Sequence, residues 1–169
     1  MRTPGDKEAF LQLMDDHKGI IIKICHTYCP DTNEREDLAQ EIMYQLWRSM
    51  GSFDDEHRFS TWMYRVALNV AISFYRKAKI KNSVITSQNE TDEIADATEG
   101  KEELENDILQ LQQFINELKE LDRALMFLYL ESKTYREIAE ILGISETNVA
   151  TRINRIKDKL KQKFSIIKK

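Results

Sequence analysis

The stretch Thr134-Tyr-Arg-Glu-Ile-Ala-Glu-Ile-Leu-Gly-Ile-Ser-Glu-Thr-Asn-Val-Ala-Thr-Arg-Ile-Asn-Arg-Ile-Lys157 decides the fold, because it predicts two helices joined by a sharp turn. Gly143 stands at the turn, where glycine accepts a positive φ without steric cost. Ser145 is a suitable N-cap for the second helix. Apolar side chains at helical spacing predict a buried face on both helices: Ile138, Ala139, Leu142, Val149, Ile153, Ile156 and Leu160. Together these features predict a helix-turn-helix.

The second helix of this motif carries polar and basic side chains opposite its apolar face. They are Asn148, Thr151, Arg152, Arg155 and Lys159, all suited to base edges or phosphates. An ordinary amphipathic hairpin with a solvated basic face is the alternative interpretation. The agreement of glycine, cap and apolar register favours a helix that lies in a DNA major groove.

The distribution of charge supports a DNA contact near the C-terminus. The 169 residues carry a net charge of −4, which taken alone argues against a nucleic-acid binder. However, residues 1–79 have a net charge of −1, residues 80–122 of −9 and residues 123–169 of +6. The basic charge therefore coincides with the predicted helix-turn-helix.

Apolar periodicity predicts helices along the whole chain and no strands. The expected helices cover residues 6–28 with a break at Gly19, 36–50, 60–79, 104–118, 121–130 and the helix-turn-helix. Before residue 104 the periodicity dissolves into a stretch rich in Ser, Thr, Asn and acids. The prediction is an all-α protein of two small helical domains, residues 1–80 and 104–169, joined by a flexible acidic linker, residues 81–103.

The predicted helix over residues 60–79 carries a second functional signal. Four polar side chains fall on one stripe of it: Arg65, Asn69, Ser73 and Arg76. Aromatic residues lie close to this stripe in the sequence: Phe53, Phe59, Tyr64 and Tyr75. An unstacked base requires such rings to stack on and polar groups to read its edge. Trp62 and Phe74 are expected in the core, whereas Phe53, Tyr64 and Asn69 are equally compatible with a structural role.

Two clusters suggest a metal or acid–base site, and neither is complete. Cys25, His26 and Cys29 lie within one helical turn, but a tetrahedral site needs four ligands, and free cysteines commonly act as small core residues. The loop Asp54-Asp-Glu-His57 lacks a second converging element. We therefore expect no metal, no cofactor and no enzymatic activity.

Without a membrane-length apolar run or a secretory signal, the protein is expected in the cytoplasm.

Three segments, in this order, carry a resemblance to a known family. They are Glu36-Asp-Leu-Ala-Gln-Glu41, Phe59-Ser-Thr-Trp-Met-Tyr-Arg-Val-Ala-Leu-Asn69 and Tyr135-Arg-Glu-Ile-Ala-Glu140. Their combination resembles the small two-domain bacterial sigma factors of the extracytoplasmic-function (ECF) group, from about residue 10 to residue 164. The helix-turn-helix alone is weakly specific, whereas the first two segments together are highly specific.

The resemblance implies three surfaces. A helix with Asp37, Gln40 and Glu41 would bind the clamp helices of core RNA polymerase. The region that reads and melts the minus-ten element would include Phe53, Tyr64, Val66, Asn69, Arg76 and Lys77. The minus-thirty-five element would be read as duplex by Thr147, Asn148, Thr151, Arg152 and Arg155. Since the residues nearest a recognition helix N-terminus enter the groove deepest, Thr147, Asn148 and Thr151 are expected to read bases, Arg155 to contact the backbone, and Arg152 to do either.

The resemblance also implies partners, and the sequence departs from the family in places. The expected partners are core RNA polymerase, promoter DNA as duplex and as unstacked nontemplate strand, and an anti-sigma protein that could hold the chain at the membrane.

Ser73 stands where many members have aspartate, and the basic run after Arg76 is short. An autonomous helix-turn-helix regulator that works without polymerase is the alternative, and the promoter sequence does not follow from the residues.

Overall fold

The computed structural model describes residues 4–53, 56, 58–84 and 101–167, and within these ranges the regular elements are helices without any strand. The all-α prediction is confirmed. The elements are α1 (Pro4–Asp16), α2 (Lys18–Tyr28), α3 (Thr32–Ser49), the short 3-10 helix η1 (Met50–Ser52), α4 (Phe59–Val84), α5 (Lys101–Glu117), α6 (Glu120–Leu130), α7 (Tyr135–Leu142) and α8 (Glu146–Ile167).

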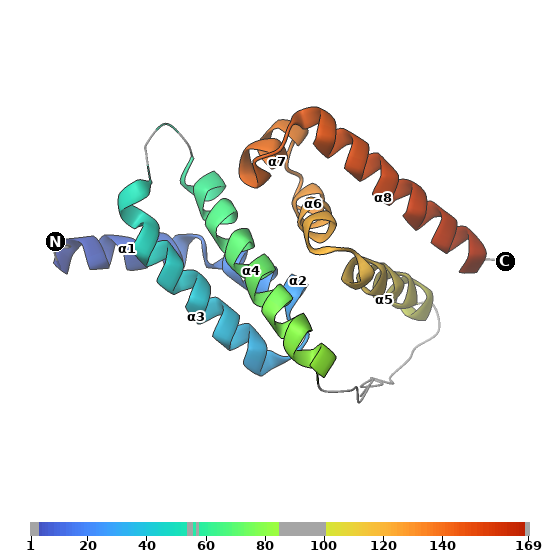
Figure 1. Ribbon diagram of the computed structural model, residues 1–169, viewed down its shortest axis with the longest axis horizontal. Coiled ribbons are helices and arrows are strands. Elements are labelled where there is room, and N and C mark those ends of the chain that lie inside the picture. The colour runs from blue at the N-terminus through green and yellow to red at the C-terminus, as the bar shows by residue number, and fades with distance from the viewer. Residues whose placement is uncertain (1–3, 54–55, 57, 85–100, 168–169) are drawn as a thin grey trace.

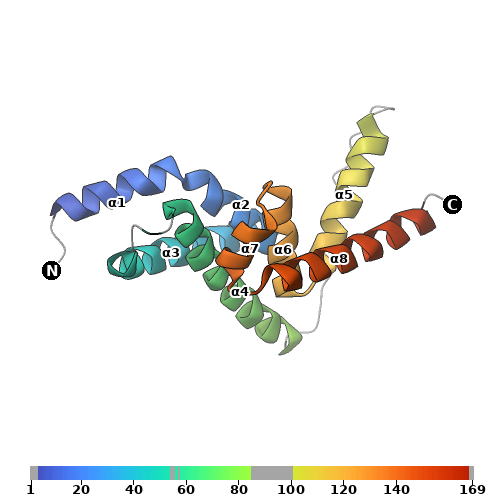
Figure 2. The ribbon, with the colours of Figure 1, turned by 90° about the horizontal axis from the view of Figure 1, so that it is seen from above.

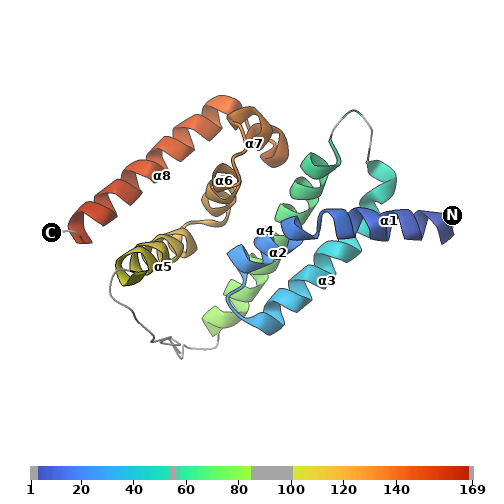
Figure 3. The same cartoon turned by 180° about the vertical axis from the view of Figure 1, so that it is seen from behind.

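The helices form two groups that lie side by side (Figure 1). The N-terminal module consists of α1 to α4, and the C-terminal module of α5 to α8, as the view from behind also shows (Figure 3). Seen from above, α5 and the far end of α8 extend away from the N-terminal module (Figure 2). The predicted division into two helical domains is confirmed. Residues 85–100, which hold most of the predicted flexible acidic linker, lie outside the described residues.

Buried aliphatic side chains of α3 form the centre of the N-terminal module. Leu38, Ile42 and Leu46 are fully buried, as their spacing predicts. They pack in one core with side chains of α4, the most deeply buried of which are Met63, Ala67, Leu68 and Ala71. Burial of each large aliphatic side chain contributes about 1.5–3 kcal/mol, so the α3–α4 pair is held firmly.

Two helix boundaries near the N-terminus differ from the prediction. The long first helix breaks at His17 and not at Gly19, because His17 has φ −118° and ψ 14° and its Nδ1 lies 3.0 Å from the carbonyl oxygen of Leu13. The second helix begins at Thr32 and not at Glu36, because the Asp31 side chain accepts a hydrogen bond from the backbone N–H of Asn33. At Thr32 a side-chain cap sets the boundary, whereas at His17 the non-helical backbone conformation ends the first helix.

The helices on either side of the predicted linker are longer than periodicity indicated. α4 continues to Val84 and α5 begins at Lys101, so the ends of the expected linker, residues 81–84 and 101–103, are helical. Apart from Val84 these residues are polar or charged, none is Gly or Pro, and apolar spacing gives no signal there. Among the described residues, no helix combines the length and apolarity needed to cross a membrane.

The predicted helix-turn-helix is present with its expected turn and caps. Gly143 ends α7 with φ +69°, the left-handed conformation that glycine adopts without strain. The Ser145 hydroxyl oxygen accepts a hydrogen bond from the backbone N–H of Asn148, 3.1 Å away, and so caps α8. Ile138, Val149 and Ile153 are fully buried between the helices, which fixes the angle at which α8 leaves the module.

A capping box begins α7 and leads to a stability prediction. The Thr134 hydroxyl accepts from the backbone N–H of Glu137, and the Glu137 carboxylate accepts from the backbone N–H of Thr134. This backbone hydrogen bond lowers the pKa of Glu137 below its ordinary value of 4.5. Because the pKa is depressed, the stabilisation that the Glu137 carboxylate gives to the fold is complete above pH 4.5. It is lost as the pH falls through the lower pKa of the folded state.

Thr134→Ala is expected to lower the free energy of unfolding by about 1 kcal/mol in urea titrations at neutral pH. Glu137→Gln retains a capping side chain, so we expect it to keep most of the neutral-pH stability while weakening the loss in acid. Equal acid sensitivity in the wild type and Glu137→Gln would show that another group is responsible.

Candidate functional site

A groove between α3 and α4 brings two predicted surfaces together. Asp37 and Glu41 from α3 line it opposite Asn69 and Lys77 from α4, and the groove has a volume of about 560 Å³. Gln40 is exposed on the same helix as Asp37. Acidic groups thus face an amide and an ammonium group across one depression, with the buried α3–α4 core directly beneath.

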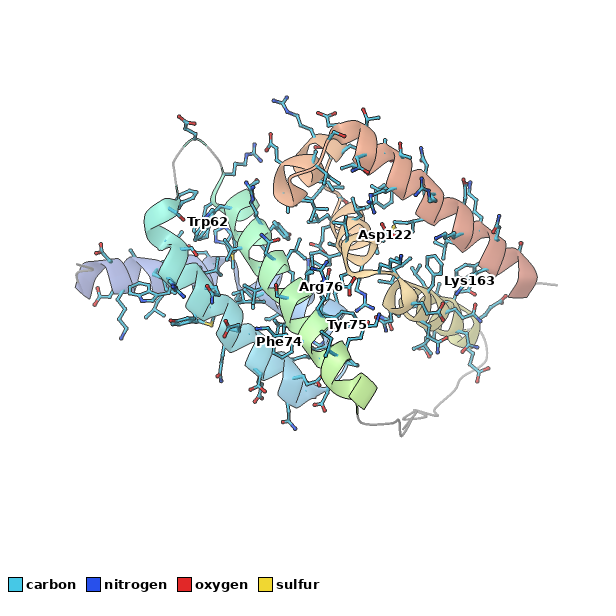
Figure 4. All side chains as sticks on the ribbon, viewed as in Figure 1. Trp62, Phe74, Tyr75, Arg76, Asp122 and Lys163 are labelled. Carbon is cyan, nitrogen blue, oxygen red and sulfur yellow. The ribbon has the colours of Figure 1, made fainter. Side chains whose placement is uncertain are left out.

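The polar stripe of α4 lies in solvent as its spacing predicts. Arg65, Asn69, Ser73 and Arg76 are all exposed, and their neighbours on the opposite side of the helix are buried. A substitution on this stripe therefore changes a surface and leaves the core intact. Figure 4 labels Arg76 on α4.

Phe53 belongs to an aromatic cluster at the N-terminal end of α4. Its ring centroid lies 5.5 Å from that of Phe59 and 5.4 Å from that of Trp62, distances typical of favourable aromatic pairs. Beside this cluster is a cavity of about 410 Å³, which Phe53, Trp62 and Arg65 line from one module and Gly143 and its neighbours from the other. Figure 4 shows Trp62 at this end of the helix.

Tyr64 is buried by the C-terminal module. Only 4 % of its surface is exposed; its ring lies 6.2 Å from the Phe127 ring, and the Lys133 ammonium lies 5.1 Å from its centroid. Burial, with a smaller contribution from the Glu131 carboxylate, raises the pKa of Tyr64 to about 12. Val66, the neighbouring candidate, is half-buried against the core. In this arrangement of the modules a DNA base cannot stack on Tyr64.

Polar contacts reinforce the junction of the two modules. The Lys23 ammonium lies 3.0 Å from the Glu131 carboxylate, and the Tyr28 hydroxyl donates a hydrogen bond to the carbonyl oxygen of Glu120. The guanidinium of Arg123, which is 2 % exposed, lies over the rings of Tyr75 at 4.5 Å and Tyr28 at 5.5 Å. Burial, the largest cause, raises the pKa of Tyr28 despite this nearby cation.

The candidate DNA-reading residues of α8 divide into two groups. Thr147, Thr151 and Arg155 are exposed. Asn148 and Arg152 are half-buried and bonded to each other, since Arg152 Nε donates to Asn148 Oδ1 at 2.9 Å. Thr147, Thr151 and Arg155 lie on the exposed side of α8, whereas Asn148 and Arg152 lie on the flank between this side and the buried residues, where Arg152 reaches Asp122 of α6.

Sequence reasoning missed two charged residues of α6. Asp122 binds a candidate DNA-reading residue of α8, and Arg123 lies at the junction of the two modules. Asp122 Oδ1 accepts from Arg152 Nη1 at 3.2 Å, and Arg123 joins the modules. The signal was available, because two charged residues interrupt the apolar run from Leu121 to Leu130. Periodicity alone cannot identify their partners, which lie about 30 and 50 residues away.

Cys25 and Cys29 are buried in the core of the N-terminal module. Burial is the main cause that raises the pKa of each thiol to about 11, so both remain protonated and act as small apolar side chains. Within the described ranges, no three His, Cys, Asp or Glu side chains converge on a point where they could hold a metal ion.

Family models match both modules. Residues 13–80 match sigma-70 region 2, and residues 108–160 match sigma-70 region 4, so the chain is a two-module protein of the sigma-70 class. It is 33% identical to the ECF RNA polymerase sigma factor SigW of Bacillus subtilis, over 95% of this chain and 91% of that protein. It is 32% identical to the RNA polymerase sigma-H factor of Pseudomonas aeruginosa, over 91% of this chain and 85% of that protein. The chain belongs to the ECF family of RNA polymerase sigma factors.

Two solved structures have the same fold at low sequence identity. CnrH in complex with the cytosolic domain of CnrY has a TM-score of 0.68 at 19% identity, covering 96% of this chain and 91% of that one. RpoE of Bartonella quintana in complex with the anti-sigma factor NepR has a TM-score of 0.65 at 19% identity, covering 97% and 99%.

Proposed function

We propose that this chain binds core RNA polymerase, directs it to specific promoters and assists the opening of promoter DNA. The observation that carries the proposal is the presence, in one chain, of a polar α3–α4 groove and a capped recognition helix on two modules that match regions 2 and 4. The chain contributes no bond-making group of its own to this function; RNA synthesis belongs to the polymerase.

The exposed side of α3 is the proposed polymerase contact. Asp37, Gln40 and Glu41 lie on solvent-exposed positions of a helix whose opposite side is fixed in the core. A rigid helix that displays carboxylates suits a basic partner surface, because no ordering of the chain is needed on binding.

Strand opening would draw on binding energy to an unstacked base. Unpairing costs a few kcal/mol, and stacking on an aromatic ring returns about 1–3 kcal/mol per base. The proposed minus-ten surface combines the Phe53 aromatic cluster with Asn69 and the basic Arg76 and Lys77. Use of Tyr64 in the same surface requires the modules to separate, because Phe127 and Lys133 cover its ring.

An anti-sigma protein is a further proposed partner. The two structures of similar fold are both complexes, one with the cytosolic domain of CnrY and one with the anti-sigma factor NepR. A protein of this kind could hold the chain inactive in the cytoplasm or beside the membrane.

The alternative is a helix-turn-helix regulator that acts without polymerase. Run-off transcription with purified core RNA polymerase on a library of upstream regions separates the two. We expect specific transcripts only when both proteins are present. Sequence-specific DNA binding by the chain alone, unchanged by added polymerase, would favour the autonomous regulator.

Asn69→Ala is expected to reduce promoter opening about tenfold, because an exposed amide that contacts the unpaired base is lost. Permanganate footprinting of a promoter selected by the wild-type holoenzyme measures the opening. Asn106→Ala, which removes an exposed amide from α5, is the matched control and should open the promoter normally. Equal opening by both variants would show that Asn69 has no part in melting.

A further inference from the structure

Three side chains from two helices form a linked set at the start of the recognition helix. The Asp122 carboxylate on α6 accepts from Arg152 Nη1 at 3.2 Å, and Arg152 Nε donates to Asn148 Oδ1 at 2.9 Å. Figure 4 shows Asp122 pointing from α6 toward α8. The set is partly withdrawn from solvent, since the side chains of Asp122 and Arg152 are 22% and 35% exposed.

The chemistry of arginine fixes the orientation of the Asn148 amide. A guanidinium has donors and no acceptor, so only the oxygen of Asn148 can face it. The backbone N–H of Asn148 is already bonded to Ser145 Oγ. The side-chain NH₂ group, which offers donors only, is therefore the part of Asn148 that faces DNA without a neighbouring positive charge.

We propose that Asp122 and Arg152 are positioning residues that restrict Asn148 to base edges presenting acceptors, with guanine preferred and thymine second. The inference rests on the proposed function, in which α8 reads duplex DNA. It assigns Arg152 to the interior of the reading surface and gives Asp122, which lies on another helix, a part in specificity.

The geometry of base edges gives the preference. In the major groove guanine presents two acceptors, N7 and O6, and thymine presents the O4 acceptor. Adenine is read by asparagine through a pair of bonds, one of which needs the side-chain oxygen as acceptor for N6–H. Arg152 already holds one lone pair of that oxygen, so adenine N6–H would have to use the second lone pair beside a positively charged guanidinium, which weakens the paired contact to adenine.

Thr151 supplies the complementary polarity one turn further along α8. Its hydroxyl hydrogen is donated to the carbonyl oxygen of Thr147 at 2.9 Å, so toward DNA it offers acceptor lone pairs and a methyl group. The surface thus presents donors at Asn148 and an acceptor with a methyl group at Thr151. Asn148 therefore requires hydrogen-bond acceptors on the base edge that it contacts, whereas Thr151 requires a donor or an apolar group.

A binding selection on randomised minus-thirty-five DNA, with holoenzyme reconstituted from the full chain and core polymerase, tests the proposal. Asn148→Ala identifies the base position that Asn148 reads, as the position whose preference disappears. We expect guanine or thymine there in the wild type. Adenine at that position, or no position that responds to Asn148→Ala, would overturn the proposal.

Release of the amide tests the positioning role. Arg152→Met removes the donors and keeps the apolar stem, and Asp122→Ala removes the carboxylate that holds Arg152. Each should raise the ratio of adenine to guanine at the Asn148 position by about fivefold or more, since the guanidinium no longer competes for the Asn148 oxygen and the paired adenine contact is strengthened. Asp122→Glu should retain the wild-type preference, and Glu117→Gln, a control on α5, should have no effect.

The outcomes also separate this inference from the function on which it rests. A wild-type holoenzyme that selects no upstream motif overturns the proposed function and this inference with it. A wild-type motif that Arg152→Met leaves unchanged overturns only the positioning role. If Asp122→Ala lowers the unfolding midpoint, Arg152→Met decides the question, because its aliphatic stem preserves the packing beside Asn148.

Discussion

Glu41→Lys is expected to lower the affinity of the chain for core RNA polymerase by about tenfold or more, because a like charge placed in an interface costs several kcal/mol. Glu41 is exposed on α3, and its carboxylate accepts a hydrogen bond from Gln45 on the same helix at 3.1 Å. The core positions Leu38 and Ile42 are buried, whereas Glu41 lies at the exposed edge of the α3–α4 groove. The unfolding midpoint should therefore stay close to that of the wild type.

Titration of fluorescently labelled chain with core polymerase measures this effect. Asp37→Lys, one turn earlier and lining the same groove, is expected to act in the same direction. Glu8→Lys is the matched control, because it reverses an exposed charge on α1 outside the groove. If Glu41→Lys and Asp37→Lys bind polymerase as tightly as Glu8→Lys, this side of α3 is not the polymerase contact.

Arg123→Ala is expected to loosen the junction of the modules and to lower the free energy of unfolding by about 2 kcal/mol. The side chain is buried, donates to the Tyr75 hydroxyl and to the carbonyl oxygen of Asn116, and lies against two tyrosine rings. Its loss leaves the Tyr75 hydroxyl without this donor and creates a void beneath α6. Figure 4 shows Tyr75 on α4 beside the C-terminal module.

Urea unfolding and small-angle X-ray scattering measure the two consequences. We expect a lower unfolding midpoint and a larger radius of gyration for Arg123→Ala. Arg136→Ala is the matched control, since Arg136 on α7 is exposed and pairs only loosely with Glu140 at 3.8 Å; it should change stability by less than about 0.5 kcal/mol. An unchanged radius of gyration in Arg123→Ala would show that Tyr64 and Phe127 hold the modules together without it.

The sequence alone reveals the environment of Glu41 but not that of Arg123. Glu41 could be assigned to the solvated side of its helix from Leu38, Ile42 and Leu46 alone, because periodicity within one helix determines which side is buried. Arg123 could not, because a charged residue in an apolar helix is ordinarily exposed. Its burial depends on Tyr28 and Tyr75, which another module supplies.

The sequence by itself determined the features that short-range interactions control. The helix-turn-helix followed from Gly143, Ser145 and the apolar register, since a positive φ, a cap and helical spacing each act within a few residues. The exposed stripe of α4 and the family of the chain followed from the same local patterns. The predicted break at Gly19 was wrong. The helix breaks at His17, and the contact of the His17 ring with the carbonyl oxygen of Leu13 gives no signal in apolar spacing.

Only the tertiary structure decided which candidate residues are available to a partner. Tyr64 is covered by Phe127, and the Asn148 amide is oriented by Arg152 and Asp122. Packing of α6 against α4 and α8 produces both results, bringing together side chains that lie far apart in the sequence. Helical periodicity predicts which side of a helix is apolar, but which helix covers that side depends on the packing of the whole chain.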